Sequence, residues 1–215
     1  GLAKEGFRHV HVLRSEADVA AVSFVREPLW NARKGDTGPF DIVGDVHGCL
    51  DELTQLLGRL GWPVMAGRVG PNGGRKLVFL GDLVDRGPDS PGVVELVRRA
   101  VEDGLALAIP GNHDAKIAKW LGGKKISVDH GADLTMAQYE VRPEWKESHR
   151  EFLDGLISHY VLDGGRLVVA HAGMKEAMQG RASGAVRGFA LYGETTGETD
   201  EFGLPVRFPW AEEYG

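Results

Sequence analysis

The pattern of apolar and polar residues is clearest after residue 40, where short apolar runs alternate with amphipathic stretches. Three short apolar runs have the length of strands and predict buried strands at 40–44, 76–81 and 105–111. Two stretches between them carry apolar residues at helical spacing and predict helices at 49–60 and 90–104. Strands and helices in this order predict a parallel sheet with right-handed crossovers, and therefore an α/β fold.

Cap and turn residues indicate where further elements begin and end. Ser90 is the expected N-cap of the second helix, and Ser15 is the expected cap of a short helix near the start of the chain. The alternation over 9–13 predicts a short strand before that helix. Glycine and proline punctuate 31–39 and 68–76, so we expect a linker and a loop there.

The second half of the chain contains fewer periodic segments. Helices are expected from Asp114 onward and over 143–156. The segment 160–171 predicts a hairpin whose turn is formed by 163–165. The tail from residue 172 is rich in glycine and is expected to be irregular.

Composition limits the classes of protein that the chain can represent. A length of 215 residues with 42% hydrophobic content is sufficient for one globular domain with a full core. The net charge of −6 argues against a protein that coats nucleic acid, although recognition of a single terminus remains compatible with it. No apolar run approaches the ~18 residues of a membrane helix, so no membrane partner is expected. Cys49 is the single cysteine, which fits a reducing cytoplasm.

Polar side chains with metal-binding capacity follow four of the predicted strands. They lie in GDVHG (44–48), GDLVDRG (81–87), GNHD (111–114) and VVAHAG (168–173). Such a mixed set of oxygen and nitrogen donors suits Mn, Fe or Zn better than Ca or a thiolate-bound metal. One motif alone could be a turn, or in GNHD a capped helix start. Four on successive strand ends favour a metal site, because open α/β sheets place their sites there.

These four motifs resemble the signature of the calcineurin-like binuclear metallophosphoesterases. The segment 159–210 further resembles the phosphatase module of bacterial polynucleotide kinase-phosphatases, and the resemblance extends from Phe40 onward. It implies an α/β fold with two β-sheets sandwiched between helices and a site at the C-terminal ends of the strands. It also implies that residues 1–35 are a connector from an upstream kinase module. Residues 36–215 would then be a metallophosphoesterase domain, truncated at its C-terminus.

The resemblance assigns five metal ligands. Asp45, His47 and Asp82 would hold the first divalent cation, most simply Mn²⁺. Asp82 would bridge to a second cation, which Asn112 and His171 would also bind. Two dications outweigh the charges of two carboxylates, so the centre stays positive and suits a phosphate substrate within an acidic chain.

The resemblance also assigns the groups that act on the substrate. His113 would donate a proton to the leaving oxygen, a contribution of about 10²–10⁴ in rate for a poor leaving group. Asp85 would orient His113, and Arg86 and Asn112 would contact the phosphate. A mutual ion pair between Asp85 and Arg86 at a helix start is the alternative to these roles.

One departure from the family pattern concerns the second cation. The family supplies another histidine in a later GH motif, and no such motif follows in this sequence. We therefore expect the first cation to bind and the second to be held weakly or not at all. The sequence also starts without methionine, so we expect a segment of a longer protein.

Two further groups could contact a substrate. Arg181 and Arg187 lie among small residues in GRASGAVRG and could bind the end of an RNA, or lie in a flexible loop. His130 could border the site, although a surface role is the simpler expectation.

The function implied by the resemblance is a phosphatase of RNA repair. It would remove 2′-, 3′- or 2′,3′-cyclic phosphates from RNA 3′ ends, with the kinase and adenylyltransferase (ligase) modules of the same polypeptide as its other partners. A protein Ser/Thr phosphatase and a diadenosine tetraphosphate hydrolase share the same four motifs and remain alternatives. A non-enzymatic docking module between kinase and ligase has no need of intact metal ligands.

Overall fold

The computed structural model describes residues 10–25, 27–201, 203 and 205–209. Its helices are α1 (Glu16–Ala21), α2 (Leu50–Arg59), α3 (Ser90–Glu102), α4 (Asn112–Leu121), α5 (Ala132–Glu140), α6 (Lys146–Gly155) and α7 (Gly184–Tyr192). Its strands are β1 (Phe40–Val43), β2 (Val64–Met65), β3 (Arg68–Val69), β4 (Lys76–Phe79), β5 (Ala106–Ala108), β6 (His159–Leu162), β7 (Leu167–Ala170), β8 (Thr195–Thr199) and β9 (Pro205–Arg207). Short 3₁₀ turns lie at Pro143–Trp145, Asp163–Gly165 and Glu176–Met178.

A parallel sheet with the order β1-β4-β5 forms the centre of the fold, as the sequence predicts. Val43 of β1 pairs with Phe79 of β4, and Phe79 pairs with Ala108 of β5. These three residues are the last of their strands, so the three strands end side by side. The loops that follow therefore start from one edge of the sheet.

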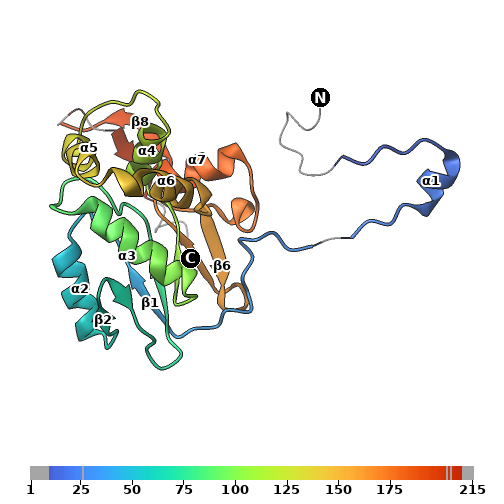
Figure 1. Cartoon of the computed structure of the whole chain (residues 1–215). Helices are drawn as coiled ribbons and strands as arrows, with labels where there is room; N and C mark the ends of the chain where they lie inside the picture. Colours follow the sequence, from blue (N-terminus) through green and yellow to red (C-terminus); the bar gives the residue numbers. More distant parts are fainter. Residues whose placement is uncertain (1–9, 26, 202, 204, 210–215) are drawn as a thin grey trace.

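Side chains of β4 alternate between two hydrophobic layers. Leu77 and Phe79 point into the core that α2, α3, α4 and α6 complete, and Val78 points to the opposite face. There it packs with Tyr160 and Leu162 of the antiparallel hairpin β6-β7. In Figure 1, α3 lies across the strands of the parallel sheet. Strand β6 lies on the opposite side of that sheet from α3, as both views show.

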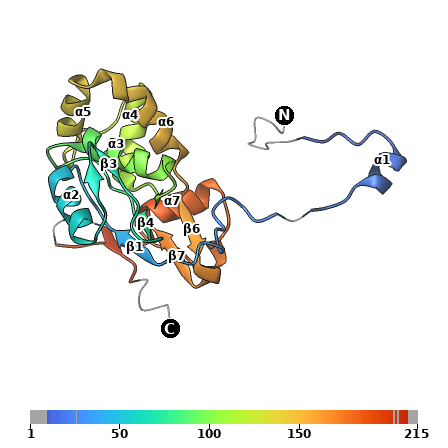
Figure 2. The ribbon, with the colours of Figure 1, turned by 60° about the horizontal axis from the view of Figure 1, so that its bottom comes forward.

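Helix α7 covers the outer side of the β6-β7 hairpin. Val186 and Ala190 of this helix are buried in a third apolar cluster, against which Val168 and Ala170 of β7 are packed. Figure 2 shows α7, β6 and β7 together in orange. The order of layers is thus helices, parallel sheet, antiparallel hairpin and helix, which confirms the predicted arrangement of two sheets between helices.

Two helices begin at residues other than those the sequence predicts. The N-cap of α3 is Asp89, whose side chain accepts from the Gly92 amide, because the Ser90 hydroxyl accepts instead from the Asp85 amide. Helix α4 begins at Asn112 and not at Asp114. The Asp114 carboxylate accepts from the Gly111 amide at 2.8 Å and so closes the first turn two residues earlier.

Three other local expectations are wrong. Residues 10–13 form no strand, because no described segment pairs with them, and His9 lies outside the described residues. The predicted loop 68–76 begins with β3, which pairs with β2 through a turn whose two central residues, Ala66 and Gly67, are both left-handed. The tail forms helix α7, whose N-cap is Ser183, and then the β8-β9 hairpin.

The first segment described, 10–25, lies apart from the body in both views (Figures 1 and 2). The helix expected after Ser15 is confirmed as α1, with a capping box between Ser15 and Asp18, and none of its residues is buried. Within the described ranges, no helix has the length and apolar character needed to cross a bilayer.

Candidate metal centre and proton donor

Loops from both sheets bring the predicted ligands together. Asp45 and His47 follow β1, Asp82 follows β4, and Asn112 follows β5, all at the carboxyl edge of the parallel sheet. His171 follows β7 and reaches the same place from the antiparallel hairpin. The expected convergence of four strand ends is therefore present in the structure.

Direct contacts between backbones bring these loops close to one another. The Asp82 carbonyl accepts from the amides of Val46 and His47 at 3.1 and 2.8 Å. Gly81 and Gly111 face each other so closely that a Cβ on Gly81 would lie 2.2 Å from the Gly111 nitrogen. The glycines of the motifs are thus needed for the close approach that places Asp82 between the other ligands.

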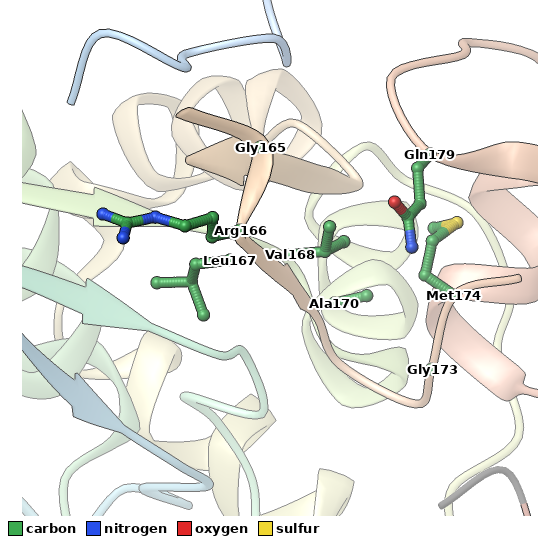
Figure 3. Close-up of a pocket in the computed structure, with 8 residues that line it drawn as sticks. All are labelled: Gly165, Arg166, Leu167, Val168, Ala170, Gly173, Met174 and Gln179. Carbon is green, nitrogen blue, oxygen red and sulfur yellow. The ribbon is translucent and has the colours of Figure 1, made fainter. Parts of the chain in front are cut away.

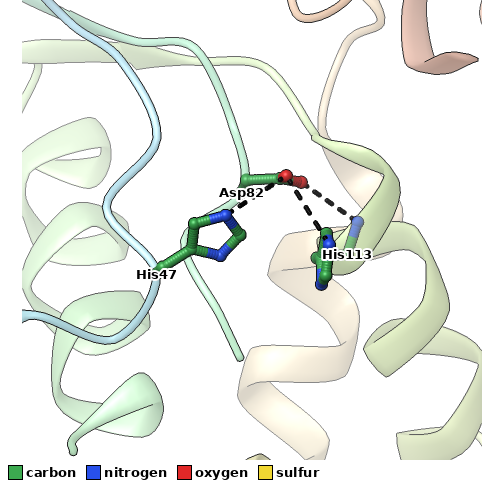
Figure 4. Close-up of side chains that lie close together, drawn as sticks. All are labelled: His47, Asp82 and His113. Carbon is green, nitrogen blue, oxygen red and sulfur yellow. Dashed lines mark hydrogen bonds and ion pairs between the residues drawn. The ribbon is translucent and has the colours of Figure 1, made fainter. Parts of the chain in front are cut away.

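Asp82 lies at the centre of the first group of ligands. Its Oδ2 is 3.7 Å from Nε2 of His47 and 3.9 Å from Nε2 of His113 (Figure 4). Nε2 of His47 is also 3.9 Å from Oδ2 of Asp45. Asp82 is buried, whereas just over half of the Asp45 side chain is exposed. Asp45 is therefore the most exposed residue of this group.

The second group shares Asp82. Nε2 of His171 lies 3.5 Å from Oδ2 of Asp82 and 3.1 Å from Oδ1 of Asn112. Nδ1 of His171 is 3.9 Å from Oδ1 of Asp45. Donor atoms of Asp45, Asp82 and His171 all lie within 4.8 Å of one another, and the same is true of His47, Asp82 and His113.

Hydrogen bonds to backbone carbonyls direct the ligand histidines. Nδ1 of His47 lies 2.8 Å from the Val84 carbonyl, and Nδ1 of His171 lies 2.9 Å from the Leu80 carbonyl. A carbonyl can only accept, so Nδ1 carries a proton in both rings, and Nε2 is the nitrogen directed at the carboxylates. This arrangement is the usual outer-shell orientation of metal-binding histidines.

The Nε2 atoms of both rings then face oxygen atoms of the other candidate ligands. Nε2 of His171 faces the Asn112 amide oxygen and the Asp82 carboxylate, and Nε2 of His47 faces the carboxylates of Asp45 and Asp82. Carboxylate, amide and imidazole groups that converge at these distances suit a divalent cation. The residues present therefore fit divalent cations, with Asp45, His47, Asp82, Asn112 and His171 as the groups that would hold them.

His113 is paired with Asp85 beside this centre. Its Nδ1 lies 2.6 Å from Oδ2 of Asp85, which is fully buried. Lys116 Nζ lies 3.5 Å from the same oxygen. The partners of the Asp85 carboxylate are thus His113 and Lys116, and Arg86 is an exposed neighbour. Sequence reasoning passed over Lys116, although it follows His113 by three residues and so lies on the same face of α4.

Asp114 is a carboxylic acid whose pKa is strongly altered by its surroundings. It is completely buried, and this burial, together with the charge of Asp82, raises the pKa of Asp114 to about 7. Its two oxygens accept from the amides of Leu83 and Gly111, at 2.9 and 2.8 Å. Asp114 therefore joins the loops after β4 and β5 without facing the ligand centre itself.

The remaining predicted site residues lie in different settings. Arg86 is exposed and packs against Gly131, and the His130 ring lies 6.3 Å from the His113 ring. Arg181 is exposed. Arg187 donates from Nη1 to the Leu156 carbonyl at 2.8 Å, so part of its guanidinium has a partner within the fold.

The cavity drawn in Figure 3, of about 470 Å³, adjoins the second sheet. It runs along β7 from Arg166 to Ala170 and continues to Met174 and Gln179. Its lining includes none of the five ligands, and His171 lies between two of its residues in sequence. It therefore neighbours the centre without forming part of it.

Comparison with known families agrees with the fold. Residues 38–199 match the model of the calcineurin-like phosphoesterase family. The chain belongs to this family, and the superfamily expected from the four motifs is confirmed. A protein serine/threonine phosphatase from Saccharomyces cerevisiae has the same fold, with a TM-score of 0.50 and 14% identity over 87% of this chain and 60% of that one.

Curated relatives carry a more specific name. An asymmetrical bis(5′-nucleosyl)-tetraphosphatase PrpE from Geobacillus thermodenitrificans is 42% identical over 179 residues, which is 81% of this chain and 73% of that protein. The protein of the same name from Bacillus subtilis is 40% identical over 180 residues, 81% of this chain and 74% of that one. These relatives are named for tetraphosphate hydrolysis and not for RNA repair, so they favour an alternative over the leading expectation from the sequence.

Proposed function

We propose that this chain is a metal-dependent phosphoesterase that cleaves a phosphoanhydride bond of bis(5′-nucleosyl) tetraphosphates. The observation that carries this proposal is the convergence of carboxylate, imidazole and amide groups on Asp82, next to the His113–Asp85 pair. The class of substrate is taken from the names of relatives that are 42% and 40% identical to this chain.

The bound cations would supply the electrophilic chemistry. Divalent cations, which we propose to be Mn²⁺, polarise phosphate oxygens and lower the pKa of water when they occupy such a site. Asp82 contributes a carboxylate to both groups and so fixes their separation. Arg86 is exposed beside the centre and can hold two phosphate oxygens in a fork.

His113 would donate a proton to the leaving group. Because Nδ1 is bonded to Asp85, the ring can hold a proton at Nε2 and transfer it to the departing oxygen. A phosphate that leaves from an anhydride is a weaker base than an alkoxide. Proton donation by His113 therefore accelerates the cleavage of a tetraphosphate less than that of an ester of a sugar hydroxyl. This difference can be measured by comparing rates for substrates with different leaving groups.

Phosphorylated RNA 3′ ends are the second candidate substrate. The resemblance of 159–210 to polynucleotide kinase-phosphatases supports it, and so does the setting of Arg181 just before α7. The Arg181 side chain is exposed, while its carbonyl accepts from the Asn31 amide group at 3.0 Å. In this case the chain would remove 2′-, 3′- or cyclic phosphates beside kinase and adenylyltransferase modules.

A direct competition between substrates tests the proposal. Diadenosine tetraphosphate, RNA with a 2′,3′-cyclic phosphate and a phosphopeptide are offered with Mn²⁺ and with a chelator. We expect the tetraphosphate to be cleaved to two unequal nucleotides, with loss of activity in chelator and in Asp82→Asn. Asp51→Asn is the matched control, because Asp51 is an exposed carboxylate on α2.

Each other result has a definite meaning. Preference for the RNA would replace the tetraphosphate by the second candidate, and preference for the peptide would exclude both. Activity that persists in chelator and in Asp82→Asn would refute the metal centre. Absence of hydrolysis of every substrate, in this chain and in a longer one, would support the non-enzymatic docking module.

A further inference from the structure

Two buried hydroxyl groups hold the backbone of the residue that orients His113. The Asp85 amide donates to Oγ of Ser90 at 3.0 Å and to Oγ1 of Thr135 at 2.9 Å. The two hydroxyl oxygens are themselves 3.0 Å apart. Asp85, Ser90 and Thr135 are all fully buried, so water does not compete for these bonds.

A second side chain of α5 holds the same loop. Gln138 accepts from the Ser90 amide at 2.8 Å through Oε1 and donates to the Gly87 carbonyl at 2.9 Å through Nε2. Thr135 and Gln138 are three residues apart and therefore lie on one face of the helix. That face makes hydrogen bonds to two backbone groups of the loop that follows β4 and to the amide of the first residue of α3.

The loop needs such support because of its backbone conformation. Asp85 and Arg86 have φ values of 72° and 68°, so two successive residues with side chains occupy the left-handed region. The start of α5 is seated against them, since a Cβ on Gly131 would lie 2.5 Å from the Arg86 nitrogen. Conformations of this kind persist only where neighbouring groups determine them.

The direction of the Asp85 carboxylate depends on this backbone. Its Oδ2 meets His113 and Lys116, but Oδ1 is buried and has no hydrogen-bond partner among the described residues. No group on the Oδ1 side therefore fixes the carboxylate. Its aim at Nδ1 of His113 follows from the position of the Asp85 main chain.

We infer that Thr135 and Gln138 are positioning residues, through which α5 sets the alignment of Asp85 and the proton-donating ring of His113. The inference rests on the proposed function for the role of His113. Helix α5 has an independent attachment, because the Tyr139 hydroxyl lies 2.9 Å from Nδ1 of His149 and Nε2 of His149 lies 3.0 Å from Glu95. Loss of the Thr135 hydroxyl should therefore change the loop without releasing the helix.

Kinetics with two leaving groups test this role. Thr135→Val removes the acceptor at nearly constant volume, Thr135→Ser retains it, and Thr37→Val is the matched control at an exposed threonine. With Mn²⁺, Thr135→Val is expected to lower kcat for phenyl phosphate by about 10²-fold, near the lower limit for a general acid. For p-nitrophenyl phosphate, whose leaving group departs without a proton, we expect a loss of about threefold or less.

The remaining variants separate positioning from a general defect. KM should change little in Thr135→Val, and Thr135→Ser should restore most of kcat. Gln138→Met should show the same dependence on the leaving group, with a smaller loss. Equal losses on both substrates would indicate a merely structural role, and unchanged kcat on both would refute the inference.

A spectroscopic measurement tests the inference without relying on activity. The 2.6 Å bond between His113 and Asp85 should give a low-field Nδ1 proton resonance, assigned by its absence in Asp85→Asn. We expect this resonance to shift or vanish in Thr135→Val and to persist in Thr135→Ser and Thr37→Val. An unchanged resonance in Thr135→Val would refute the inference even if the wild-type chain hydrolyses no phosphoester, a result that would refute the proposed function separately.

Discussion

The two sheets contribute unequally to the candidate site. The parallel sheet β1-β4-β5 places Asp45, His47, Asp82 and Asn112 at one edge, together with His113. The antiparallel hairpin β6-β7 contributes His171. One sheet therefore supplies the first group of candidate ligands and the proposed proton donor by itself, and the other sheet completes the second group.

The loops of the two sheets also differ in how they are held. Loops of the parallel sheet contact each other through main-chain hydrogen bonds and through Asp114, so each ligand depends on its neighbours. His171 is held across the two sheets by a hydrogen bond to the Leu80 carbonyl. Changes on the parallel side should therefore disable the whole centre, and changes on the hairpin side should affect one part of it.

Asp82→Asn should give the largest effect. The carboxylate is common to both groups of ligands, and its Oδ1 also accepts from the His113 amide at 3.0 Å. The loss of transition-state charge stabilisation should reduce kcat/KM by about 10⁴-fold, equivalent to about 5 kcal/mol. Steady-state kinetics together with metal analysis provide the test. Retention of both metal and activity would show that the two cations do not share the Asp82 carboxylate.

His113→Ala should have the next largest effect, and it should leave metal binding mainly intact. His113 contacts Asp82, but its Nδ1 is committed to Asp85. We expect kcat to fall by about 10²–10³-fold on an ester with a poor leaving group and far less on a tetraphosphate. If metal content falls in parallel with kcat, His113 is a ligand, as its proximity to His47 and Asp82 also allows.

Much of this parallel half could be predicted from the sequence. The strands are short apolar runs, and each is followed by Asp, His or Asn residues, whose oxygen and nitrogen atoms can bind metals. Asp45 with His47 and Asn112 with His113 therefore stand out without any coordinates. Hydrogen bonds between distant loops could not be predicted, because the Ser90 hydroxyl was expected to cap a helix and in fact accepts from the Asp85 amide.

The elements that sequence reasoning missed lack a clear hydrophobic period. In α5 the apolar Leu134 and Met136 alternate with polar residues, and the helix is held by polar contacts of Thr135 and Gln138. In α7 two glycines reduce helix propensity, yet packing of its apolar face against β7 is sufficient to form the helix. Tertiary contacts decide both cases, and they are not visible in a local pattern.

His171→Ala should separate the contributions of the two sheets to cation binding. The variant removes the ligand from the hairpin and leaves Asp45, His47 and Asp82 in place. We expect binding of the second cation to be lost and the first to remain, with a decrease in kcat of about 10²-fold, or roughly 3 kcal/mol. Calorimetric titration with Mn²⁺ should show one tight site in the variant.

The wild-type titration tests the expectation that the second site lacks a ligand. One tight and one weak site should appear, because Asn112 and His171 are the only predicted ligands that belong to the second cation alone. Two equally tight sites in the wild-type chain would contradict that expectation. Loss of both sites in His171→Ala would contradict the independence of the first group.

The smallest effect concerns the stability of the hairpin side as the pH falls. His159 in β6 is fully buried, and burial lowers its pKa below the usual 6.5. Its Nε2 accepts from the Gly180 amide at 3.0 Å and lies 3.2 Å from the Asn31 amide nitrogen, so the neutral ring is the form that the fold uses. Below about pH 6.5 the unfolded chain binds this proton and the folded chain does not, so the free energy of unfolding decreases as the pH falls.

A pair of variants isolates this contribution. Asp114, whose folded pKa is about 7, has the opposite effect: it raises the free energy of unfolding as the pH falls. His149 has the same effect as His159, because burial also lowers the pKa of His149. Both terms are common to the wild type and to His159→Gln, so they cancel when the two are compared. Between pH 7 and pH 5 the Tm of the wild type should fall by a few degrees more than that of His159→Gln. The exposed His11→Gln should follow the wild type, and equal slopes in all three chains would show that the hairpin side is not the acid-sensitive part of the fold.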